Sequence, residues 1–217
     1  MLLSIFGLNA QTQTQAEWQQ SVNHTIDAKL NPETNILSIN QDLTYFNNSP
    51  DELSYIYFHI WPQAFSNKQT PFGQESFKNG LKAFVHAPKS ALSKISNISF
   101  SIQDVSLSYS QHEDYGNEVL RVNLSKPLKS GQSVQIKNTI SIFIPDVFSR
   151  FGTNEGFYSM TQWYPKPAVY DVNGWNVFPY KGIGEYYSEY GKYKVSISLP
   201  SNYVVAATGE LKTDTEM

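Results

Sequence analysis

Gln162-Trp163-Tyr164-Pro165-Lys166-Pro167-Ala168-Val169-Tyr170-Asp171 is the stretch around which the chain is organised. Two prolines one residue apart exclude a helix or a central strand, because each lacks a backbone donor and fixes φ. The residue before each proline is also driven toward extended geometry. We therefore predict a stiff, mostly extended crossing segment over residues 162–171.

Aromatic side chains fill this crossing segment and the residues after it, where a solvent-facing loop would carry Ser, Asn and Lys. Trp163, Tyr164 and Tyr170 lie within it, and Trp175 and Phe178 follow. Rings with one polar edge suit a loop that packs on a sheet or lines a binding wall. We favour packing over a binding wall, since buried aromatic residues are most often structural.

Alternating apolar and polar residues on both sides of the crossing segment predict β-strands. Residues 22–30 and 37–45 alternate and flank a turn at Pro32, so they form a hairpin. Residues 53–61 are apolar on both faces, which predicts a central strand. Residues 63–96 read as a long surface excursion with a short helix near 90–95. Further strands are predicted at 98–102, 105–109 (after a bulge near 103–104), 120–124, 134–144, 193–199 and 203–211.

About nine short strands with little helix predict an all-β fold: a β-sandwich or a large, curved, mainly antiparallel sheet. The strand at 203–211 would be left without a partner, so we expect a longer protein that supplies the last strand or strands. We divide the chain into residues 1–17, a signal-peptide remnant with a polar linker, and a β-rich domain over 18–217.

Composition excludes several classes of function. The 217 residues carry a net charge of −3, and only 16% of them are charged, which disfavours nucleic-acid binding. With 0 cysteines, disulfides, thiolate catalysis and Cys-bound zinc are absent.

The N-terminus resembles an export signal. Residues 2–8 are apolar and Asn9-Ala10-Gln11 resembles a cleavage site, although the basic start of a normal signal is missing. A frayed apolar tail is the alternative. No apolar run approaches the roughly 20 residues that span a bilayer, so we expect no membrane span. We expect an exported protein that is periplasmic, outer-membrane-associated or extracellular.

The residues show no catalytic constellation and no metal site. His24 and His59 lie in predicted strands, and packing is the more common role for such histidines. His112-Glu113-Asp114 lacks the second histidine of a zinc helix, because position 116 is Gly. The carboxylates in aromatic loops are more often solvated or capping. Those that could form a glycoside-hydrolase pair are Asp146, Asp171, Glu185 and Glu189.

Three stretches in order resemble the N-terminal domain of the M1 family of zinc aminopeptidases, the aminopeptidase N-like gluzincins, in the branch common in Bacteroidetes-type bacteria. The first is Phe58-His59-Ile60-Trp61-Pro62-Gln63-Ala64-Phe65. The second is residues 160–171 with Gly174-Trp175-Asn176 and Pro179-Tyr180. The third is residues 185–197 with the ending 205–211. The match spans about Trp18 to Leu211.

The resemblance implies a saddle-shaped β-domain beside a thermolysin-like catalytic domain that binds one zinc and removes N-terminal residues from peptides. The zinc ligands, the general base and the amine anchor would lie beyond Met217, so we expect no cofactor in this chain. The partners would be the catalytic domain of the same polypeptide and a peptide substrate. The resemblance also implies substrate-pocket roles for Gln162 and Tyr164. The candidates for interface or loop contacts are Trp163, Tyr170, Asp171 and Trp175.

A second hypothesis is an independent secreted β-sandwich that binds a glycan or a protein through the aromatic loop at residues 158–180. Trp163, Trp175 and Tyr180 would form its binding wall.

Overall fold

The computed structural model describes residues 18–184 and 186–212. Strands account for 47% of the residues and helices for 11%, and the mostly antiparallel sheets do not close into a barrel. This confirms the predicted all-β sandwich. The expected signal-peptide remnant and linker, residues 1–17, lie outside the described residues.

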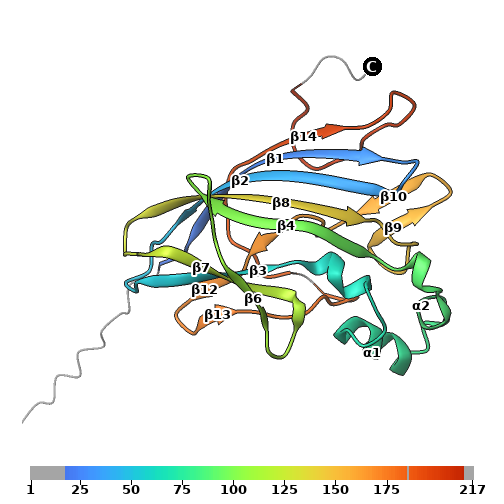
Figure 1. Cartoon of the computed structure of the whole chain (residues 1–217), viewed down its shortest axis with the longest axis horizontal. Coiled ribbons are helices and arrows are strands. Elements are labelled where there is room, and N and C mark those ends of the chain that lie inside the picture. Colours follow the sequence, from blue (N-terminus) through green and yellow to red (C-terminus); the bar gives the residue numbers. More distant parts are fainter. Residues whose placement is uncertain (1–17, 185, 213–217) are drawn as a thin grey trace, which may run out of the picture.

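A six-stranded sheet forms the first layer and has the order β14-β1-β2-β8-β4-β5 (Figure 1). Neighbouring strands are antiparallel except β1 and β14, which run parallel with His24 level with Tyr193. On the inner face of β1 the side chains of Val22, His24 and Ile26 are buried, as the period of two predicts. The strands are β1 (Ser21–Asn31), β2 (Ile36–Phe46), β4 (Lys94–Ile102), β5 (Val105–Ser106), β8 (Ser133–Phe143) and β14 (Tyr193–Ser198).

A four-stranded sheet forms the second layer and has the order β11-β3-β7-β6. Its strands are β3 (Leu53–His59), β6 (Tyr109–His112), β7 (Gly116–Leu128) and β11 (Lys166–Pro167). The rings of Phe58 in β3 and Phe100 in β4 lie 4.9 Å apart, so side chains of both layers meet in one apolar core. Two hairpins complete the strands: β9 (Phe151–Asn154) with β10 (Phe157–Met160), and β12 (Val169–Asp171) with β13 (Gly174–Asn176).

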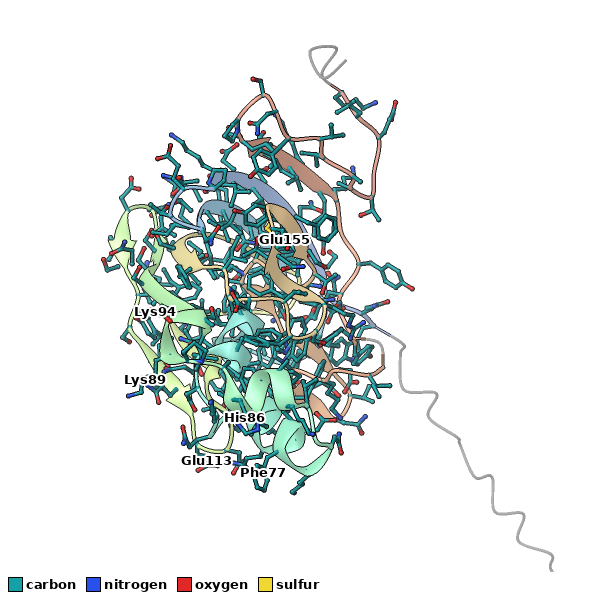
Figure 2. The ribbon with its side chains drawn as sticks, turned by 90° about the vertical axis from the view of Figure 1, so that its right-hand side faces the viewer. Phe77, His86, Lys89, Lys94, Glu113 and Glu155 are labelled. Atoms are coloured by element: carbon teal, nitrogen blue, oxygen red, sulfur yellow. The ribbon has the colours of Figure 1, made fainter. Side chains whose placement is uncertain are left out.

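Short helices gather at one end of the sandwich, as both views show (Figures 1 and 2). They are the 3₁₀ helix η1 (Trp61–Phe65), α1 (Pro71–Lys78), α2 (Lys82–His86) and the 3₁₀ helix η2 (Lys89–Ala91). The hydroxyl of Thr70 accepts a hydrogen bond from the Gly73 N–H at 3.0 Å, which caps the start of α1. Phe77 of α1 points outward and is 75% exposed.

Several local predictions were wrong. Residues 203–211 form no strand, so the partnerless strand that suggested a longer protein does not exist. Gln103 and Asp104 are not a bulge but the two-residue turn between β4 and β5, with φ of 49° and 62°. The helices of the excursion are α1, α2 and the 3₁₀ helix η2, and the helix predicted near 90–95 overlaps only the end of η2, because Ile95 belongs to β4.

Candidate functional site

The crossing segment joins the edge of the second sheet as β11. Lys166 pairs with His59 and Pro167 with Phe58, and the Ala168 N–H donates to the carbonyl of Tyr57 at 2.8 Å. An edge strand tolerates proline because one side of it needs no donors. The segment is extended from Lys166 to Asp171, whereas Gln162 has a left-handed φ of 55°. The backbone therefore turns at Gln162 before it enters the sheet.

Lys166 lies in the middle of a row of aromatic rings that connects the two layers. Its ammonium nitrogen is 5.4 Å from the centroid of Tyr164 and 5.7 Å from that of Trp61. The row continues outward on both sides. His59 stacks on Trp61 at 4.4 Å, and His24 meets the edge of Tyr164 at 5.6 Å. Cation–π attraction stabilises an ammonium in this position by about 0.5–2 kcal/mol.

The described hydrogen-bond acceptors of Lys166 are neutral. Its Nζ donates to Oε1 of Gln162 at 3.0 Å and to Oγ of Ser188 at 3.4 Å. Burial lowers the pKa of Lys166 to about 8. Burial and the nearby Lys166 charge lower the pKa of His24 to about 4 and that of His59 to about 3. At pH 7 the site therefore holds one cation flanked by two neutral imidazoles.

Both histidines are packed residues, as the sequence suggested. His24 is 3% exposed, and its Nδ1 lies 2.9 Å from Nε2 of Gln41. His59 is 0% exposed, and its Nε2 accepts the N–H of Phe178 at 3.3 Å. The imidazoles thus position neighbouring segments around the lysine.

The structure brings Gln162, Trp163 and Tyr164 together at this site. Trp163 meets the ring of Tyr164 edge-on at 5.2 Å, and all three side chains are partly exposed. Lys166 was not predicted from the sequence as a site residue. The available signal was that it is the one cation inside the densest aromatic stretch of the sequence.

Tyr170 and Asp171 line a separate cleft of about 390 Å³. Trp18 stacks on Tyr170 with ring centroids 5.7 Å apart, and the Tyr170 N–H donates to Glu189 at 3.3 Å. Burial raises the pKa of Glu189 to about 7. Trp18, Gln19, Val169, Tyr170, Asp171, Tyr187 and Glu189 line the cleft.

Trp175 of β13 does not line this cleft but packs against Tyr170, one of its lining residues. Its ring lies 4.9 Å from that of Tyr170, 6.1 Å from Tyr55 and 5.8 Å from Tyr57. Tyr180 is 1% exposed. Trp163, Trp175 and Tyr180 therefore form no common wall, and the structure does not favour the glycan-binding hypothesis.

The carboxylates considered for glycoside hydrolysis do not all lie at one site. Asp171 and Glu189 share the 390 Å³ cleft, whereas Asp146 lines a separate cavity of about 810 Å³ at the helical end, with His86 and Glu155 (Figure 2). Glu185 lies outside the described residues. Glu189 accepts hydrogen bonds from Gln19 and from the Tyr170 backbone, which is a capping role.

Zinc coordination requires at least three closely placed ligands. No group of three or more His, Cys, Asp or Glu residues that could hold a metal ion occurs within 18–184 and 186–212. His112 lies at the turn between β6 and β7, where its Nδ1 accepts the Asp114 N–H at 3.1 Å. The described residues thus do not fit a zinc ion. Over the same residues, no helix combines the length and the apolar character that crossing a membrane requires.

Comparisons with known proteins identify the fold. No protein-family model and no curated protein matches the sequence. Among solved structures, the chain is similar to a substrate-bound variant of the M1 zinc metallopeptidase from Deinococcus radiodurans, with TM-score 0.50 and 14% identity. It is also similar to a two-domain M1 zinc metallopeptidase variant bound to L-tryptophan, with TM-score 0.51 and 14% identity. Each match covers 92% of this chain but only 36% and 37% of the other chain, so the fold is that of one part of these enzymes.

Proposed function

We propose that this chain is the non-catalytic N-terminal domain of an M1-type zinc metallo-aminopeptidase and that it flanks the substrate cleft. The observation that carries the proposal is the structural match, which covers almost all of this chain and about a third of the M1 enzymes. The three ordered motifs at residues 58–65, 160–180 and 185–211 support the same assignment. In this proposal zinc and the catalytic groups belong to the remaining part of the protein.

A surface suited to a partner domain lies on the inner face of β14. Tyr193 and Val195 are level with the buried residues His24 and Ile26 of β1, yet they are 46% and 43% exposed. An inner face of a sandwich is normally covered, so this exposed apolar strip favours docking of another structural unit. We assign the strip to the catalytic domain of the same polypeptide.

Gln162 and Tyr164 are the residues that we propose for the pocket of the substrate's first side chain. Both are partly exposed, and Gln162 is fixed by its left-handed backbone and by the bond to Lys166. A preorganised side chain at the edge of a rigid sheet is suited to contact a peptide. Residues 2–11 further support export of the protein, which N-terminal sequencing of the secreted and periplasmic fractions would test.

The reading frame downstream of residue 217 is the direct test of the assignment. We expect an H-E-x-x-H motif within the next one or two hundred residues. The 217-residue chain alone should contain no stoichiometric zinc and should release no amino acid from peptides. One tightly held zinc per chain, or peptidase activity that persists after full purification, would contradict the proposal.

A further inference from the structure

The side chain of Lys166 is a partly buried cation whose contacts with described residues are all uncharged. Gln162 and Ser188 accept its hydrogen bonds, and aromatic rings surround its nitrogen. The ion pairs between described residues are Lys137 with Asp104 and Lys212 with Glu210, so no described carboxylate lies within 4.0 Å of the Lys166 ammonium. Removing a charge from water without a counter-ion costs several kcal/mol.

Within residues 18–184 and 186–212, the groups packed around Lys166 supply no negative charge. The titratable side chains nearest it are His24 of β1, His59 of β3 and Tyr164 of the crossing segment. Tyr186 packs on the ring of Trp61, and Tyr193 of β14 packs on the ring of His24. Imidazoles and phenols carry no negative charge at pH 7. An anion at this site would therefore come from outside the described residues.

We propose that Lys166 and Gln162 form a binding site for the side-chain carboxylate of a peptide ligand. Two of the three N–H groups of Lys166 point to Gln162 and Ser188, which leaves one donor for a ligand. Oε1 of Gln162 is used by Lys166, whereas its Nε2 donates to none of the described residues. One ammonium N–H and one amide N–H side by side match the two oxygens of a carboxylate.

The position of the two side chains makes the site reachable. Lys166 and Gln162 are both partly exposed, so a ligand can approach from solvent while the rings of Trp61 and Tyr164 exclude water from the inner side of the ammonium. Partial exclusion of water strengthens a charge-assisted hydrogen bond. If the proposed function also holds, the ligand is an acidic first residue of the substrate. That identification, but not the carboxylate site, rests on the proposed function.

The test is a titration of the 217-residue chain with N-acetylglutamic acid α-amide, which carries one side-chain carboxylate, and with its neutral isostere N-acetylglutamine amide. Chemical shifts of the backbone amides report binding. We expect the acid to bind at least tenfold more tightly than the amide. Lys166→Met should weaken binding of the acid at least tenfold, and Lys129→Met, an exposed lysine in a turn, should leave it unchanged.

Proton uptake provides a readout that a purely structural lysine would not give. At pH 8 the free amine is partly unprotonated, and a bound carboxylate raises its pKa, so binding should take up protons. Calorimetry in two buffers with different ionisation enthalpies measures this uptake, which Lys166→Met should abolish. Urea unfolding of the variant verifies that it is folded.

Equal affinity for the acid and the amide, or unchanged binding in Lys166→Met, would overturn the proposal. The proposal would also be overturned if the parent chain bound no acid but a Glu185→Gln variant did, because the Glu185 carboxylate would then occupy the site in the parent chain. The outcome is independent of the reading-frame test. A positive titration without a downstream H-E-x-x-H would retain the carboxylate site and remove the peptidase assignment.

Discussion

Replacing Lys166 with methionine should stabilise the protein at neutral pH. Burial lowers the pKa of Lys166 from its ordinary value of 10.5 to about 8, and each pKa unit is worth roughly 1.4 kcal/mol. The charged amine therefore costs the folded state about 3 kcal/mol at pH 7, part of which its hydrogen bonds and cation–π contacts already offset. A methionine of similar length retains the packing without the charge.

The pH dependence distinguishes this charge effect from a packing effect. Between pH 8 and 10.5 the unfolded chain holds a proton on Lys166 that the folded chain has lost, so the stability of the parent protein rises over this range. The advantage of Lys166→Met should therefore be largest below pH 8 and should shrink by about 3 kcal/mol toward pH 10.5. Urea unfolding followed by tryptophan fluorescence at pH 7, 9 and 10.5 measures the difference. A difference between the two proteins that does not change with pH would refute the reasoning.

Three further substitutions test the fold around the site. Asn47→Ala should lower the free energy of unfolding by about 2–4 kcal/mol, because the buried amide forms hydrogen bonds with four other residues. The control Asn117→Ala, at an exposed position, should cost less than about 0.5 kcal/mol. Urea unfolding measures both. Burial raises the pKa of Glu118 from 4.5 to about 7. The parent protein should therefore lose up to about 3 kcal/mol of stability as the pH rises from 4.5 to 7. A Glu118→Gln variant that loses the same stability over this range would contradict the prediction. In Gly191→Ala the new Cβ would lie 1.6 Å from the carbonyl oxygen of Val22, which is too close for both atoms to keep their positions. Amide hydrogen exchange of β14 should therefore accelerate at least tenfold, while β2 and β8 stay protected. Unchanged exchange in β14 would show that the chain shifts freely at Gly191.

The sequence predicts best those parts of the fold that depend on local patterns. The hairpin of β1 and β2 follows from alternation and a proline turn, and both strands occur within a residue or so of the predicted limits. The helix at 71–78 was missed because Gly, Pro and Asn nearby suggested a loop. Thr70 followed by Pro71 was the signal available, since it places a capping residue before a first-turn proline.

Features that depend on distant residues were beyond sequence reasoning. Alternation at 203–211 predicted a strand, but a strand also needs a neighbour that can pair with it, which a sequence pattern does not show. The aromatic row around Lys166 combines residues of β1, β3, η1 and β11, so no local window contains it. The prediction of substrate-pocket roles for Gln162 and Tyr164 came from the resemblance alone, and it stays a prediction.

The parallel pairing of β1 with β14 affects how the protein is made. Tyr193 leaves the ribosome 169 residues after His24, its partner in the sheet. At roughly 5–20 residues per second, one edge of β1 stays open for on the order of ten to thirty seconds during synthesis. An open edge can pair with other nascent chains, so a holdase chaperone that shields this edge should increase the yield of native protein.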